Sequence, residues 1–197
     1  MNSFFTFEGI DGSGKTTVLD VVFNTLQNNG YDVIKTMEPT DTDIGRYVTD
    51  CIKSGKDPVV TAFTFICDRI LHGKQIIQWL DDGYIVLCDR YDDSTYAYQG
   101  AQLQDKMDDP INWLKELSKD RFPLPDRTYL FSIAPEEAIQ RIQHRDELIA
   151  FEKVSFLEKV NQNYTLLSKG KRYKIIDATQ PIDSIAHQII DDITSCY

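Results

Sequence analysis

A glycine-rich stretch near the start of this sequence constrains its fold more than any other segment. Residues 9–16 read Gly-Ile-Asp-Gly-Ser-Gly-Lys-Thr, which fits the phosphate-binding pattern G-x-x-x-x-G-K-[ST]. An apolar run with Phe4, Phe5 and Phe7 precedes it, and an amphipathic helical pattern follows it and stops at Gly30. Glycines let successive backbone N–H groups point into one concavity, and the helix that begins there directs its positive dipole end at the same anion. The context thus favours a nucleoside triphosphate loop over the alternative, a simple turn between a strand and a helix.

Apolar runs typical of β-strands alternate with helical patterns along the whole chain. The runs are Phe4–Phe7, Val33–Thr36, Tyr84–Cys88, Thr128–Ile133 and Tyr173–Ile176. This alternation predicts a parallel sheet with helices on both faces. Because no repeat, low-complexity tract or linker interrupts the pattern, we expect one domain over residues 1–197. The predicted fold class is α/β: a three-layer α/β/α phosphate-loop NTPase with a five-stranded parallel sheet.

The net charge and the hydropathy of the sequence limit the kinds of partner that this chain can bind. The net charge is −10 and the basic residues are dispersed, which argues against nucleic-acid binding. No basic-then-apolar leader precedes the first strand, and no apolar run approaches the ~18 residues of a membrane span. We therefore expect a cytoplasmic protein with no membrane partner.

The carboxyl end of the third expected strand carries a candidate catalytic pair, Asp89-Arg90. A carboxylate at this edge of the sheet can hold Mg²⁺ or orient an attacking group. The adjacent guanidinium suits a bidentate phosphate clamp, which indicates a second phosphorylated molecule beside the triphosphate. The alternative is a structural ion pair between the two side chains.

A helix expected over Pro58–Leu80 contains Phe65 and Arg69, four residues apart on one face. A ring and a guanidinium so placed could stack on a nucleobase and donate to its carbonyl. From spacing alone, a core phenylalanine beside a surface arginine is the favoured interpretation. Tyr98 and Gln99 are equally ambiguous.

These motifs, taken together and in order, resemble the thymidylate kinase family over nearly the whole chain. The matching stretches are Phe7–Thr17, Glu38–Thr40, Phe65–Arg69, Asp89–Tyr91, Ser94, Ala97–Ala101, Pro135–Ala138 and Asp177-Ala178. The resemblance implies a nucleoside monophosphate kinase-like fold and transfer of the γ-phosphoryl of ATP to dTMP, giving dTDP and ADP. It also implies Mg²⁺ and a homodimer, built by the long helix that contains Phe65.

The resemblance further implies a role for individual residues. The residues expected to bind ATP are Gly9, Ile10, Asp11, Gly12, Ser13, Gly14, Lys15, Thr16 and Thr17. Lys15 would neutralise charge on the transferred group, while Thr16 and Asp89 would lie at the metal. The residues expected to bind dTMP are Asp11, Glu38, Phe65, Arg69, Arg90, Ser94, Tyr98 and Gln99. Among them, Arg90 would clamp the phosphate, Phe65 would stack on thymine, and Arg69 would donate to its O4.

The sequence departs from the family pattern at two positions where relatives have an arginine. Met37 stands where many members place an arginine, and Arg46 is a candidate replacement for that cation. Gly12 follows Asp11 where some relatives have a catalytic arginine. Relatives that lack it supply arginines from a lid, here expected over about 141–153 with Arg141 and Arg145 as catalytic residues. The alternative is that these two are solvated helix charges.

Two other functions stay open at the level of sequence. One is a phosphate-loop kinase for another nucleoside monophosphate, such as dUMP, or for a nucleoside. The other is a nucleotide-dependent switch or binding protein.

Overall fold

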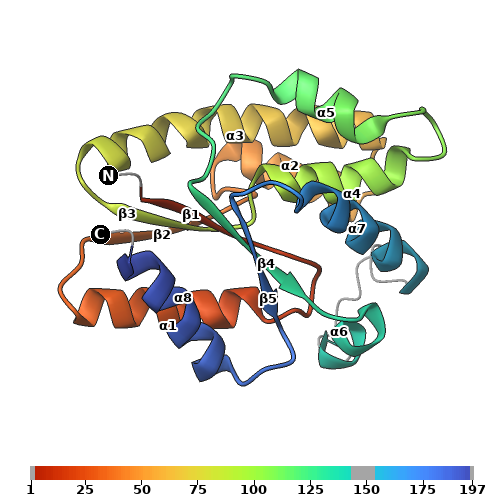
Figure 1. The fold of residues 1–197 in the computed structure, drawn as a ribbon. Helices are drawn as coiled ribbons and strands as arrows, with labels where there is room; N and C mark the ends of the chain where they lie inside the picture. The colour runs from red at the N-terminus through yellow and green to blue at the C-terminus, as the bar shows by residue number, and fades with distance from the viewer. Residues whose placement is uncertain (1–2, 143–153, 196–197) are drawn as a thin grey trace.

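Five parallel strands form a single sheet in the computed structural model, which describes residues 3–142 and 154–195. The strand order is β2-β3-β1-β4-β5, and every neighbouring pair is parallel (Figure 1). The strands are β1 (Phe4–Glu8), β2 (Val33–Met37), β3 (Ile85–Asp89), β4 (Arg127–Ser132) and β5 (Tyr173–Asp177). The predicted five-stranded parallel sheet is therefore confirmed, with strand bounds within one residue of those expected.

Helices cover both faces of the sheet. Figure 1 shows α1 and α8 on one face, with α3, α4, α5 and α7 on the other. The helices of the described residues are α1 (Lys15–Asn28), α2 (Asp43–Lys53), α3 (Pro58–Asp81), α4 (Asp92–Leu103), α5 (Pro110–Ser118), α6 (Pro135–Ile142), α7 (Val154–Leu167) and α8 (Ile182–Ser195). This arrangement confirms the predicted three-layer α/β/α fold.

Alternating side chains of β1 explain why the sheet is covered on both sides. Phe5 and Phe7 belong to the main core, which includes Leu19 of α1. Phe4 faces the opposite way and packs in a second cluster with Ile76 of α3. All five residues of β1 are buried, as expected for the central strand of a doubly covered parallel sheet.

The helix N-termini differ in how their free N–H groups are satisfied. Thr42, Asp57 and Asp109 cap α2, α3 and α5 by accepting from backbone N–H groups. Gly14 precedes α1 with φ +85° and offers no side-chain cap, and Tyr91 before α4 offers none either. The N–H groups at the start of α1 are therefore available to an anion.

The topology positions a crevice at the carboxyl edge of the sheet. The chain leaves β1 toward α1 on one face, whereas it leaves the neighbouring β3 toward α4 on the other (Figure 1). Ligands of open α/β sheets bind where such connections diverge. The two motifs that carry the chemistry lie in these two connections.

Candidate active site

The phosphate loop curls between β1 and α1 as the sequence predicts. Gly9, Gly12 and Gly14 all have positive φ, at +140°, +83° and +85°. A Cβ at Gly12 would lie 2.2 Å from the carbonyl oxygen of Ala138, so α6 packs directly on the loop. The loop thus depends on glycine for both its conformation and its contact with α6.

Lys15 places a positive charge inside this loop. Its Nζ donates to the carbonyl of Ile10 over 3.0 Å and lies 3.5 Å from Ser13 Oγ. It makes no ion pair with any described residue, and burial together with the charge of Arg90 lowers its pKa to about 8. A phosphate bound in the loop would give Lys15 a negatively charged partner.

Thr16 and Asp89 meet at the floor of the crevice. Thr16 Oγ1 donates to Asp89 Oδ2 over 2.5 Å, which joins the start of α1 to the end of β3. The other carboxylate oxygen, Asp89 Oδ1, is buried and has no hydrogen-bond partner among the residues described. A hydroxyl and a carboxylate are ligands that suit Mg²⁺, which binds through few protein oxygens together with phosphates and water. No cluster of three or more His, Cys, Asp or Glu suited to a metal occurs within residues 3–142 and 154–195.

Arg90 faces the phosphate loop from the β3–α4 connection. Its Nη1 donates to Gly9 O and to Ser94 Oγ, each over 3.1 Å, and its Nη2 forms an ion pair with Asp11. Although burial raises the pKa of Asp11, the charges of Arg90 and Lys15 hold it below its usual range. The alternative of a simple Asp89–Arg90 ion pair is wrong, because Asp89 binds Thr16 and Arg90 binds Asp11.

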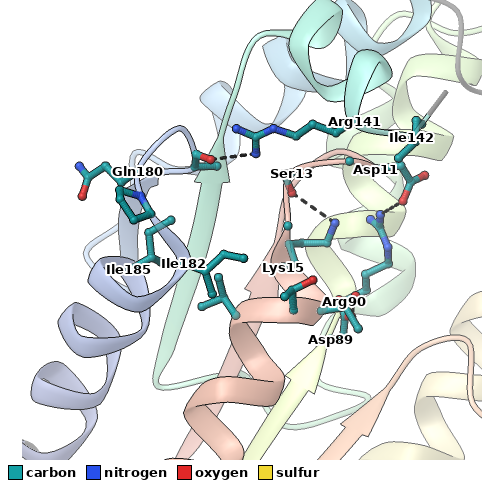
Figure 2. Close-up of a pocket in the computed structure, with 17 residues that line it drawn as sticks. Asp11, Ser13, Lys15, Asp89, Arg90, Arg141, Ile142, Gln180, Ile182 and Ile185 are labelled. Atoms are coloured by element: carbon teal, nitrogen blue, oxygen red, sulfur yellow. Dashed lines mark hydrogen bonds and ion pairs between the residues drawn. The ribbon is translucent and has the colours of Figure 1, made fainter. Parts of the chain in front are cut away.

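A first cavity of about 550 Å³ opens over the phosphate loop. Figure 2 shows Lys15 and Arg90 entering it from below and Arg141 reaching across its top. Arg141 Nη1 donates to Ala178 O over 2.9 Å, and its Nη2 pairs with Glu137. Arg145 and most of the expected lid, residues 143–153, lie outside the described residues, so the lid stays a prediction.

On the wall opposite the loop, the residues that sequence reasoning missed are those contributed by α8. Ile182 and Ile185 of α8 line the first cavity, next to Ala178, Gln180 and Pro181 of the preceding loop. Apolar side chains there suit the flat face of a purine. An amphipathic pattern in the last helix was the available signal, but nothing in it distinguishes a cavity wall from core.

A second cavity of about 150 Å³ lies on the other side of Arg90. Seven of the eight residues expected at the acceptor line it: Asp11, Glu38, Phe65, Arg90, Ser94, Tyr98 and Gln99. Ile52, Pro39 and Tyr91 complete the lining. Tyr98 connects the cavity to the loop, since its hydroxyl accepts from Asp11 N over 3.1 Å.

Arg69 is the expected acceptor residue that does not line this cavity. It is fully buried behind Glu38, to which its Nε donates over 2.8 Å, and its Nη2 donates to Tyr91 O and Thr95 Oγ1. Its Nη1 has no hydrogen-bond partner in the part of the chain that the structure describes. The surface arginine favoured from spacing is therefore wrong, because a salt bridge with a buried glutamate holds Arg69 inside.

Arg46 is not brought to either cavity. It is largely exposed and pairs with Asp41 and Asp43 at the start of α2. Its position gives no support to the idea that it replaces the arginine absent at Met37, which is itself exposed at the end of β2.

The two cavities meet at a shared wall. Asp11 and Arg90 line both of them, one from the phosphate loop and the other from the end of β3. Two ligands bound in these cavities would therefore face each other across the Arg90 guanidinium. Such an arrangement suits direct transfer of a phosphoryl group between them.

No helix among the described residues is both long and apolar enough to span a lipid bilayer.

Comparison with known proteins agrees with this geometry. The family model described as thymidylate kinase matches residues 7–189. A probable thymidylate kinase of Methanosarcina mazei is 36% identical over 192 residues, covering 95% of this chain and 93% of the relative. One from Sulfurisphaera tokodaii is 36% identical over 197 residues, with 99% and 97% covered, and one from Pyrobaculum calidifontis is 37% identical over 190 residues, with 95% and 93% covered.

Proposed function

The chain belongs to the thymidylate kinase family, and we propose on that basis that it transfers the γ-phosphoryl of ATP to dTMP, giving ADP and dTDP. The structural observation that carries this proposal is the wall shared by the two cavities. A single guanidinium, that of Arg90, lies between a phosphate loop and a small pocket with an aromatic side chain.

ATP binds in the first cavity in this proposal. The uncapped N-terminus of α1 and the backbone N–H groups of residues 9–17 would hold its phosphates. Lys15 would stabilise charge that develops on the transferred group, a contribution that matters most in the transition state. The isoleucines of α8 and the loop before it would flank the adenine.

Thr16 and Asp89 would hold Mg²⁺ beside these phosphates. The support is chemical: a hydroxyl and a carboxylate with a buried, unpartnered oxygen lie next to the loop. When bound, the ion would supply neutralising charge at the phosphate oxygens. Asp89 would additionally keep Thr16 in place through their hydrogen bond.

dTMP binds in the second cavity in this proposal. Arg90 would clamp its phosphate, Phe65 would stack on thymine, and Tyr98 and Gln99 would close the pocket around the sugar and base. In this proposal Arg69 would donate to thymine O4 through Nη1, the guanidinium nitrogen without a partner within the described residues. Because Arg69 is fully buried behind Glu38 and does not line the cavity, this contact would require the side chains around it to shift when dTMP binds. Glu38 would line the acceptor pocket and hold the Arg69 guanidinium in place through their salt bridge.

Arg141 and Arg145 are proposed to stabilise the transferring phosphoryl group. The support for Arg141 is its position on the wall of the first cavity, where its Nη1 donates a hydrogen bond to Ala178 O. A guanidinium that moves from this carbonyl to the γ-phosphate would act as an arginine finger from the same chain.

A homodimer formed through α3 is a further part of the proposal. Val60, Phe63, Leu71 and Ile77 of this helix are large apolar side chains about half exposed. Leu71→Lys should shift the chain toward monomer in light scattering, whereas Ile175→Lys, an exposed position on β5, should not. An unchanged mass for Leu71→Lys would remove α3 from the interface. With ATP and dTMP as substrates and a net charge of −10, we propose a cytoplasmic enzyme without a nucleic-acid partner.

The test of the reaction is ADP release with ATP, Mg²⁺ and a panel of monophosphates and nucleosides. Turnover led by dTMP and a rise in its KM for Arg90→Met are the expected results. If a nucleoside gives the fastest turnover and Arg90→Met has the wild-type rate, the acceptor is that nucleoside and not dTMP. ADP release that needs no acceptor would indicate a nucleotide-dependent switch instead.

A further inference from the structure

Glu8 is a buried charged residue between the two motifs of the active site, yet it lines neither cavity. It is the last residue of β1, directly before Gly9, and its side chain is fully buried. An isolated carboxylate in such a place is costly, so its hydrogen bonds decide whether it is tolerated.

Four donors from two other segments converge on the Glu8 carboxylate. Oε1 accepts from the backbone N–H of Tyr91 over 2.7 Å and of Ser94 over 3.2 Å. Oε2 accepts from Ser94 Oγ over 2.6 Å and from the hydroxyl of Tyr164 on α7 over 3.0 Å. Glu8 therefore provides from β1 the N-terminal cap that Tyr91 does not give α4.

The hydroxyl of Ser94 connects Glu8 to Arg90, because it forms a hydrogen bond with each of them. Ser94 Oγ donates its proton to Glu8, which leaves its lone pairs to accept from Arg90 Nη1 over 3.1 Å. Arg90 also has φ +66°, a left-handed conformation that an arginine adopts only where its surroundings hold it. The turn from Arg90 to Ser94 is thus anchored at both Tyr91 N and Ser94 Oγ by one carboxylate.

We propose that Glu8 is a positioning residue for the phosphate clamp: it fixes Ser94 Oγ and the first turn of α4 so that Arg90 points at the junction of the two cavities. Burial raises the pKa of Glu8 above its usual range, although the bond from Ser94, the charge of Arg90 and the bond from Tyr91 act to lower it. Glutamine would replace it only in part: with its carbonyl on the N–H groups of Tyr91 and Ser94, its NH₂ would have to donate to Ser94 Oγ, which removes the charge and uses a lone pair that otherwise accepts from Arg90.

This inference rests on the proposed role of Arg90 at the acceptor phosphate, and the experiment separates the two. Steady-state kcat and the KM for dTMP and for ATP are measured for wild type, Arg90→Met, Glu8→Gln, Ser94→Ala and the Glu8→Gln/Ser94→Ala double variant. Glu8→Gln should raise the KM for dTMP about tenfold or more, with the KM for ATP within about twofold, as loss of a charge-assisted bond predicts. Because both residues act on Arg90 through the same hydroxyl, the double variant should be no worse than the worse single variant.

Asp192→Asn is the matched control. Its carboxylate also accepts from a tyrosine hydroxyl, that of Tyr129, but it lines neither cavity. It should lower the melting temperature and leave both KM values unchanged. Should Glu8→Gln fail to fold, Glu8→Asp keeps the charge but withdraws the carboxylate from Ser94, and the same rise in the KM for dTMP is expected.

Two outcomes would overturn the inference while the clamp itself stands. One is a folded Glu8 variant that melts earlier but keeps the wild-type KM for dTMP, as the control does. The other is a double variant whose defects multiply. If Arg90→Met itself leaves the KM for dTMP unchanged, the clamp role is wrong, and the positioning role of Glu8 is overturned with it.

Discussion

Thr16 Oγ1 and Asp89 Oδ2 lie 2.5 Å apart, so that the first turn of α1 is bonded to the carboxyl end of β3. The bond uses one oxygen of the carboxylate and leaves Oδ1 buried without a partner among the described residues. Buried polar atoms of this kind are rare unless a ligand or water completes them. The free oxygen of Asp89 could therefore bind a cation next to the phosphate loop.

The first prediction concerns Mg²⁺ dependence. Asp89→Asn should raise the Mg²⁺ concentration for half-maximal rate by about tenfold or more, because a neutral amide is a weaker ligand and orients Thr16 less well. Initial rates at saturating ATP and dTMP measure this. Asp20→Asn, which removes the same charge from an exposed pair with Lys35, should follow the wild-type curve. Coinciding curves for Asp89→Asn would exclude Asp89 from the metal site.

The second prediction concerns stacking in the acceptor cavity. Phe65→Ala should weaken dTMP binding by about 1–3 kcal/mol, since base–aromatic stacking is of that order. Calorimetric titration with dTMP measures it. Phe63→Ala, two residues away on α3 and outside the cavity, should leave the affinity unchanged. A loss of thermal stability without a change in affinity would identify Phe65 as a core residue only.

Local patterns predicted the sheet and the phosphate loop because each depends on neighbours in sequence. Glycine spacing and an apolar run are enough to define β1, the loop and α1. Burial of Arg69 was not predictable in this way, since it depends on Glu38, which lies 31 residues earlier in the loop after β2. Glu8 was missed for the same reason: its partners Ser94 and Tyr164 are distant in sequence. A charged residue at the end of a central strand that is rich in phenylalanine was the available signal.

The third prediction follows from the buried pair of Arg69 and Glu38. Arg69→Met should lower the free energy of unfolding by about 3–5 kcal/mol, because it leaves the Glu38 carboxylate buried without its cation. Urea denaturation measures this, and adding Glu38→Gln should restore part of the loss. Arg46→Met, at an exposed pair, should have no measurable effect. Equal stability of the Arg69 and Arg46 variants would contradict the buried salt bridge.

The fourth prediction concerns pH and Asp93, in the first turn of α4. Burial and the charge of Asp92 raise the pKa of Asp93 to about 8, against the attraction of Arg172. The folded chain then holds a proton that the unfolded chain has released, so the stability due to this group is lost as pH rises from about 4 to about 8. Asp93→Asn removes the titration. Stability of wild type relative to this variant should therefore fall between about pH 5 and pH 8 in denaturation experiments. A constant difference would show that Asp93 is ionised throughout.

The last prediction distinguishes two glycines of the phosphate loop. Gly12 and Gly14 both have φ near +85°, so alanine at either position costs about 1–2 kcal/mol in backbone strain. At Gly14 nothing lies within 4 Å of the added Cβ, whereas at Gly12 it would lie 2.2 Å from Ala138 O, a backbone atom that side-chain rotation cannot move. Gly12→Ala must therefore displace the loop from α6, and it should lower the melting temperature and the ATP affinity more than Gly14→Ala does. Thermal melting with and without ATP measures both effects. If the two variants behave alike, strain alone determines the cost, and the contact with α6 contributes nothing to the loop.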